Sequence, residues 1–253
     1  MLFRSDQSDA AAQTLGPTLG GGLVGLLGAP LALAVDAVSY LIDALLNAGL
    51  GVEEPAAPPA ERRAVARDVQ EGLSWTYRHP TLGPLALSTH VWFVAHAAGS
   101  TALTLVALRV LDLSALVFGL LVAAGGLAGL VGATIAPAVG RRLGTGPAIL
   151  ATRSVHPLTW VLVAAASAVP SGVTGAVSIG AALVLQGLAM GVENANDTGY
   201  WQTVTPDRLL GRANATRRSV NRSAGALGAV LGGTALSLVD AGPALLGVAA
   251  VST

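Results

Sequence analysis

The chain has 253 residues, of which 53% are hydrophobic and only 11% are charged, and its formal net charge at pH 7 is zero. Soluble domains carry about 25% charged residues, so most of this chain is not expected to face water. The sequence contains no cysteine, which excludes disulfides and cysteine-ligated metals. All of its fourteen basic residues are arginines, so it has no P-loop lysine and is not an ATPase of that kind.

Apolar segments long enough to cross a bilayer, which takes about 20 residues, follow one another along the chain. The seven segments are residues 13–29, 30–51, 83–108, 114–138, 147–169, 173–198 and 222–239. A last apolar segment, 243–253, is too short to span. The sequence therefore predicts an all-α fold, a polytopic transmembrane helix bundle with about seven full spans and a truncated last one.

A polar linker separates the first two spans from the others, which divides the chain into residues 1–51, 52–80 and 81–253. The linker begins with a proline-rich stretch and continues as DVQEGLSWTYRHP, which looks helical and ends at a proline. We expect this helix to lie along the inner membrane surface. Its apolar side would be formed by Val65, Val69, Leu73 and Trp75.

The arginines lie almost entirely on one side of the predicted membrane. If the gaps between spans alternate between the two sides, only Arg109 lies opposite the others and only Arg153 lies inside a span. The remaining ones are Arg4, Arg62, Arg63, Arg67, Arg78, Arg141, Arg142, Arg208, Arg212, Arg217, Arg218 and Arg222. Positive residues stay on the cytoplasmic side, so this distribution predicts a multi-pass protein of the cell membrane, in a bacterium the inner membrane.

Glycines occur at a spacing of four in two apolar segments. The first segment, TLGPTLGGGL, contains Gly16, Pro17, Gly20 and Gly21, and the second, LGAVLGG, contains Gly228 and Gly232. In lipid, small residues at this spacing let helix backbones approach closely, so we expect tight helix contacts at both places. LGPTLGG and LGAVLGG occupy matching positions in a two-span unit, which indicates an internal repeat of the kind that builds many secondary transporters.

These motifs resemble those of a known family. GPTLGG looks like the antiporter motif in the fifth span of drug-exporting members of the major facilitator superfamily. The chain from Ser8 onward resembles the macrolide and siderophore exporter branch. The similar pieces are QTLGPTLGGGLVGLLGAPLALAVDAVSYL, DVQEGLSWTYRHPTL and WQTVTPDRLLGRANATRR.

The resemblance implies twelve spans in two bundles of six, of which this chain would supply only spans five to twelve. Residues 1–51 would be the last two spans of the N-terminal bundle, 52–80 the cytoplasmic inter-bundle linker and 81–253 the C-terminal bundle. The first four spans are expected to be missing. One departure is GATIAPAVGRR, which resembles the loop motif after the eighth span. Ala136 stands there in place of a frequent acidic residue, which weakens the gate-type salt bridge that the motif implies.

Polar residues inside the second span form one narrow stripe. Asp36, Tyr40, Asp43 and Asn47 fall within about 60° of each other at 100° per residue. Ionisable groups at bilayer depth usually face the bundle interior, so this stripe is a candidate cavity wall with a proton-titrating carboxylate. Alternatively, Asp36 lies near the outer interface and Asp43, the deeper of the two, bonds to a neighbouring helix.

Further candidates lie in later spans. Glu193 shares a face with Gln186, Met190 and Asp197, and near the cytoplasmic end we expect Glu193 and Asp197 mainly to tie their helix to the arginine-rich segment that follows. His96 could exchange protons or contact a ligand, or it could simply be a packed histidine. Arg153 is expected to snorkel to the inner surface.

Together these features predict secondary active transport. We expect proton-coupled efflux of a small amphipathic compound, with protons, this substrate and the lipid bilayer as partners. The alternative is a non-transporting membrane protein, either a remnant or an assembly partner that packs on another chain. No nucleophile–base arrangement, phosphate site or metal site stands out, so we expect no enzyme activity, no cofactor, no metal and no nucleic acid.

Overall fold

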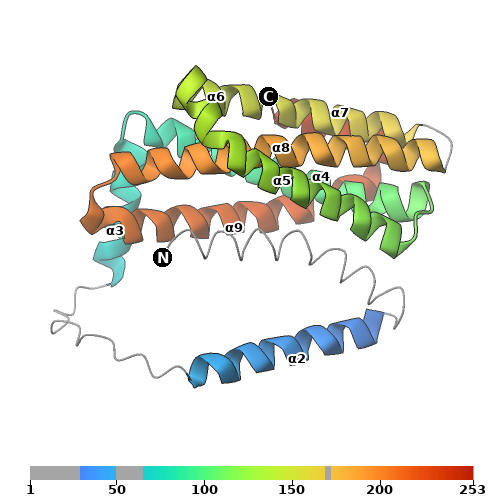
Figure 1. Ribbon diagram of the computed structural model, residues 1–253, viewed down its shortest axis with the longest axis horizontal. Coiled ribbons are helices and arrows are strands. Elements are labelled where there is room, and N and C mark those ends of the chain that lie inside the picture. Colours follow the sequence, from blue (N-terminus) through green and yellow to red (C-terminus); the bar gives the residue numbers. More distant parts are fainter. Residues whose placement is uncertain (1–28, 50–64, 169–171, 253) are drawn as a thin grey trace.

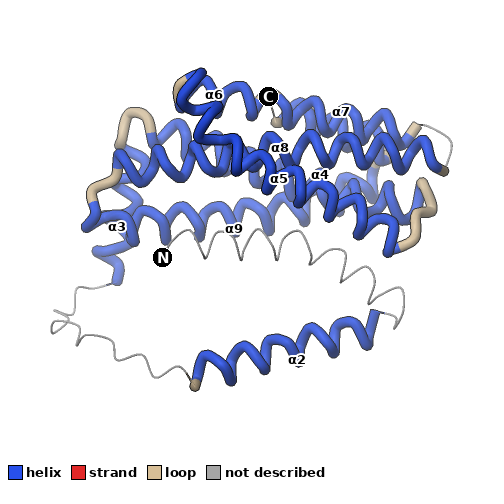
Figure 2. Tube along the Cα trace, in the orientation of Figure 1, coloured by secondary structure: helices blue, strands red, loops and turns tan. Residues whose placement is uncertain are grey.

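The computed structural model describes residues 29–49, 65–168 and 172–252, and all of their regular elements are helices. One helix, α2 (Ala29–Ala48), lies apart from the rest (Figure 1). The other helices form a bundle in which the long helices run side by side and are joined by short loops (Figure 2). The predicted all-α fold is confirmed for these residues.

Four helical stretches are long and apolar enough to cross a membrane in the part of the chain that the structure describes. They are Leu82–Val110, Ala115–Leu143, Thr145–Ser167 and Val173–Val204. These four match spans predicted from the sequence and support a multi-pass membrane protein. The total of seven full spans is not confirmed. The segments 30–51 and 222–239 fall on described helices that are not among these four. Residues 13–28 lie outside the described residues.

The helix bounds differ from the predicted spans mainly where a helix extends beyond the apolar segment into a charged one. The helices are α4 (Leu82–Leu105) with a short π-helical end η1 (Val106–Val110), α5 (Ala115–Leu143), α8 (Val173–Val204), α9 (Asp207–Leu238) and α10 (Ala241–Val251). The arginine-rich segment 208–222, expected to connect two spans, is the first half of α9. Asp207 in its first turn favours a helix start there, because a negative charge stabilises a helix N-terminus.

The span predicted at 147–169 is interrupted. It consists of α6 (Thr145–Arg153) and α7 (Val155–Ser167), which meet at Ser154. Pro157 explains the break, because proline has no N–H to donate to the carbonyl of Arg153 and its ring clashes with that carbonyl. Arg153 and His156 lie on either side of this break.

Close glycine packing joins α5 to α8. A Cβ atom at Gly187 would collide with the carbonyl oxygen of Gly125, and one at Gly191 with that of Gly129. The two glycines on each helix, Gly125 and Gly129 on α5 and Gly187 and Gly191 on α8, have the spacing of four that allows membrane helices to touch through their backbones. These four glycines lie outside the two motifs predicted from the sequence.

A second close contact joins α4 to α9. Gly228 and Gly232 are buried against Val94 and Ala98, and a Cβ atom at Gly232 would lie 2.7 Å from the Cα atom of Ala98. This helix pair is thus held at a distance that only glycine permits. The matching residues of the first motif, Gly16, Pro17, Gly20 and Gly21, lie outside the described residues.

The linker helix is α3 (Val65–Arg78), which packs on α9 and α4. The face of α3 that carries small residues packs against the protein. A Cβ atom at Gly72 would lie 2.6 Å from the hydroxyl oxygen of Thr216, and Thr76 is fully buried. Val69 and Leu73 stay exposed, whereas Trp75 packs inside the protein rather than on the expected apolar side.

Candidate functional site

A buried ion cluster lies where α4, α6, α7 and α8 meet. The Nε atom of Arg153 donates to the Oε1 atom of Glu193 over 2.9 Å, and the Nε2 atom of His156 lies 2.8 Å from the Oε2 atom. The side chains of Arg153, His156 and Glu193 are only 18%, 1% and 13% exposed. Arg153 also donates to the hydroxyls of Ser88 and Thr89 on α4.

The ion cluster lies well inside the bundle. Glu193 is eleven residues from the end of α8, or about 16 Å at 1.5 Å per residue. Arg153, which was expected to snorkel to the inner surface, instead donates to Glu193, Ser88 and Thr89 within the bundle. A charge left unpaired in a low-dielectric interior is costly, and Glu193 supplies the partner that keeps Arg153 inside.

Asp197, one turn further along α8, forms a separate ion pair. Its Oδ2 atom accepts a hydrogen bond from the Nη1 atom of Arg217 over 2.7 Å, and the guanidinium of Arg217 lies 4.9 Å from the centre of the Trp201 ring. The expected tie between α8 and the arginine-rich segment is thus made by Asp197. Glu193, which was expected to share this role, bonds to α6 and α7 instead.

An aromatic cluster lies next to the ion cluster. His96 stacks on Trp92 with ring centres 4.5 Å apart, its Nδ1 atom lies 3.1 Å from the Nε2 atom of Gln186, and its ring is 5.8 Å from that of Trp160. Trp92 in turn lies 5.3 Å from the ring of His156. His96 is therefore surrounded by protein groups. The sequence patterns did not identify Trp92 and Trp160 as parts of this aromatic cluster.

His90 joins the linker helix to two spans. Its Nε2 atom lies 2.7 Å from the hydroxyl of Tyr77 on α3, and its Nδ1 atom lies 2.6 Å from the Oδ1 atom of Asn221 on α9. Burial raises the pKa of the Tyr77 hydroxyl above its ordinary value of 10.0, so the group is protonated and can donate at neutral pH. The contact fixes α3 to the rest of the bundle.

The polar stripe of α2 is not brought to these clusters. Asp36, Tyr40, Asp43 and Asn47 are exposed, and Asn47 donates to the backbone carbonyl of Asp43 over 2.9 Å. Because α2 lies apart from the bundle, its stripe as a cavity wall stays a prediction (Figure 1). Among the residues that the structure describes, no group of histidines and carboxylates is arranged to hold a metal ion.

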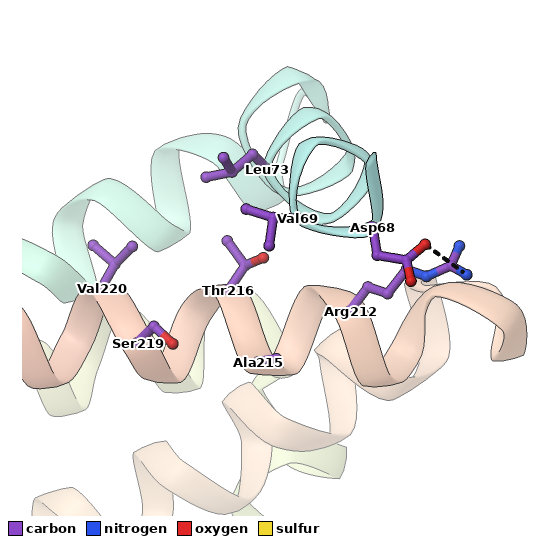
Figure 3. A pocket seen from close by; sticks show the side chains of 8 residues that line it. All are labelled: Asp68, Val69, Leu73, Arg212, Ala215, Thr216, Ser219 and Val220. Carbon is purple, nitrogen blue, oxygen red and sulfur yellow. Dashed lines mark ion pairs between the residues drawn. The ribbon is translucent and has the colours of Figure 1, made fainter. Parts of the chain in front are cut away.

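A groove of about 260 Å³ lies between α3 and α9 (Figure 3). It is lined by Asp68, Val69, Leu73, Arg212, Ala215, Thr216, Ser219 and Val220. The ion pair between Asp68 and Arg212, 3.1 Å long, closes one end. None of the residues of the ion cluster lines this groove, so it is separate from the buried site.

Comparison with known proteins identifies the family. A family model described as the Major Facilitator Superfamily matches residues 8–229. Comparisons with curated proteins and with solved structures found no match. The matched residues cover most of the chain and agree with its apolar, all-helical bundle. The chain therefore belongs to the major facilitator superfamily, whose members are membrane transporters.

Proposed function

We propose that the chain is a secondary active transporter that exports a small amphipathic compound in exchange for protons. The observation that carries this proposal is Glu193, a carboxylate inside a transporter bundle that contacts both a permanent cation, Arg153, and a titratable histidine, His156. Such a carboxylate can take up and release protons while its partners hold it in place. The resemblance to the drug, macrolide and siderophore exporters supports the outward direction.

The substrate pathway proposed from the sequence includes α2. Asp36, Tyr40, Asp43 and Asn47 would form one wall, with Asp43 as a second proton-carrying carboxylate. His96 and Glu193 would belong to the other bundle. Transporters of this kind rock one bundle against the other around a site near the middle of the membrane, so carboxylates on both sides of that site are compatible with one mechanism.

Reconstitution into liposomes tests the proposal. Liposomes that hold the full chain are loaded with an acidic buffer and placed in neutral buffer containing the amphipathic dye Hoechst 33342. Proton exit should drive accumulation of the dye, and a protonophore should abolish it. The matched variant Glu193→Gln keeps the size of the side chain but cannot release a proton, so it should lose accumulation.

The alternative function is an assembly partner that does not transport. The observation that favours it is α2, whose large apolar side chains, such as Leu41 and Leu45, are mostly exposed among the described residues. Liposomes that take up no Hoechst 33342, with or without the pH gradient, would contradict the transport proposal. Native electrophoresis of the chain purified in mild detergent would then show whether it travels with a second membrane protein.

A further inference from the structure

His156 has two ring nitrogens in different surroundings. Its Nε2 atom faces the carboxylate of Glu193, which can only accept a hydrogen bond when ionised, so the proton of a neutral imidazole resides on Nε2. Its Nδ1 atom is then an acceptor. That atom is buried and has no hydrogen-bond partner among the described residues.

Several side chains near His156 also carry buried polar atoms without partners. We call Trp92, His96, Trp160 and Gln186 the indole–histidine cluster; its rings and amide contact each other and reach the ring of His156. Of the six buried side-chain polar atoms without a partner in the described residues, four lie here. They are Trp92 Nε1, Trp160 Nε1, Gln186 Oε1 and His156 Nδ1.

Such a concentration of unpaired polar atoms indicates internal water. Buried polar groups nearly always have hydrogen-bond partners, and buried water molecules typically supply about three bonds each to groups that the protein leaves unpaired. Two indole N–H donors, one amide acceptor and one imidazole nitrogen are the kinds of partner that one or two water molecules would bridge.

We propose that His156 relays protons between Glu193 and water held by the indole–histidine cluster. The inference rests on the proposed proton-coupled function. In the inward step, an excess proton that reaches this water from the aqueous phase binds the Nδ1 atom of His156, and the proton on Nε2 passes to the Oε2 atom of Glu193. The products are a neutral imidazole with its proton on Nδ1 and a neutral carboxylic acid, so charge and protons balance.

Surrounding charges limit the relay to one proton at a time. Arg153 on α6 faces the carboxylate, and Asp197 on α8 interacts electrostatically with both Glu193 and Arg153 and is paired with Arg217 on α9. His96 on α4 and His156 on α7 are close enough that a positive charge on one disfavours a positive charge on the other. Helix α4 also carries the titratable residue His90, which is bonded to Tyr77 and Asn221. Helix α10, which packs on α7, carries no titratable side chain.

Proton transfer to Glu193 has a structural consequence. The neutral acid no longer attracts the guanidinium of Arg153, which keeps its hydrogen bonds to Ser88 and Thr89 on α4. The link between α6 and α8 weakens, whereas the link between α6 and α4 persists. The protonation state would thereby select between two packings of these helices.

Nitrogen-15 NMR of histidine-labelled protein in nanodiscs tests the relay without any transport. The chain has four histidines, so single His→Gln variants assign each signal. In the wild type, His156 should carry its proton on Nε2 at high pH and gain one on Nδ1, in exchange with water, as the pH falls. Glu193→Gln should abolish this change. A His156 that keeps only its Nε2 proton, without exchange at Nδ1, would overturn the proposal.

Transport measurements supply a second readout. Hoechst 33342 movement down its own gradient should persist in His156→Gln, whereas accumulation driven by a pH gradient should fall by about 100-fold, as for loss of a positioned proton donor or acceptor. The control His79→Gln removes a histidine whose ring, in the described part of the chain, bonds to Thr81 and Leu82 and lies 5.3 Å from that of Trp75, and it should retain accumulation. Equal accumulation in both variants would refute the relay.

Two further variants keep the test valid if His156→Gln does not fold. Trp92→Phe and Trp160→Phe retain an aromatic ring and remove one unpaired N–H each. Both should slow water exchange at His156 Nδ1 in the NMR experiment, and unchanged exchange in both would exclude water held by the cluster. Wild-type liposomes that move no dye would instead refute the proposed function, while the NMR result still decides the proton relay.

Discussion

The glycine contact between α4 and α9 allows a quantitative test of how the bundle packs. In Gly232→Ala the new Cβ atom would lie 2.7 Å from the Cα atom of Ala98, whereas non-bonded carbon atoms prefer about 3.5–4.0 Å. The two backbones must therefore separate by roughly 0.8 Å, and overpacking of this kind costs about 1–3 kcal/mol.

Gly233 provides the matched control, because it is the next residue of the same helix and a Cβ atom there meets nothing within 4 Å. Both Gly→Ala changes gain the same helix preference, about 1 kcal/mol, so this gain cancels between them. Gly232→Ala should then be less stable than Gly233→Ala by about 1–3 kcal/mol. For a protein of this size that corresponds to a melting temperature lower by about 2–12 °C.

Thermal unfolding in one detergent, followed by circular dichroism, measures this difference. Gly232→Leu should lower the melting temperature further, because a larger side chain separates the helices more. Equal melting temperatures for Gly232→Ala and Gly233→Ala would show that α4 and α9 do not touch at Ala98, and would refute the contact.

Two further predictions concern topology and coupling. The chain has no cysteine, so Ala66→Cys and Gly211→Cys each introduce a single thiol. Both thiols should resist a membrane-impermeant thiol reagent in intact cells, because arginine-rich segments stay in the cytoplasm. Labelling of both thiols from outside would reverse the predicted orientation. In a version that includes the first four spans, Asp43→Asn keeps the shape of the side chain but cannot titrate, so it should abolish dye accumulation driven by a pH gradient while leaving the melting temperature nearly unchanged. Normal, pH-dependent accumulation would make Asp43 structural.

The sequence was sufficient for the helical class, the family and several helix positions. Long apolar runs with few charges can satisfy their backbone in lipid only as helices, so the segments at 83–108, 114–138 and 173–198 were recovered as long apolar helices. The helical nature of the linker also followed from its pattern and from Pro80, which ends it. These properties depend on local sequence alone.

The partners of buried charges could not be predicted in this way. A helical wheel correctly placed Gln186, Glu193 and Asp197 on one side of α8, yet each bonds to a different helix. Which cation pairs with Glu193 depends on the packing of α6 and α7 against α8, which joins segments far apart in the sequence. Snorkelling was expected for Arg153 because the sequence does not show that a carboxylate lies within reach.

The pairing of Arg153 with Glu193 can be measured against an exposed pair in the same protein. Both members of the buried pair are less than one-fifth exposed, whereas Arg208 and Glu71 are 73% and 36% exposed. Removing one partner of a buried pair costs about 3–5 kcal/mol, because the other charge remains unpaired.

A double-mutant cycle isolates this effect. Arg153→Gln and Glu193→Gln should each destabilise the protein strongly, and the double variant should lose less stability than the sum, with a coupling energy of about 1–3 kcal/mol. The exposed pair, treated identically with Arg208→Gln and Glu71→Gln, should show at most about 1 kcal/mol, since water already screens its charges. Additive losses at Arg153 and Glu193 would mean that the two side chains do not pair in the membrane.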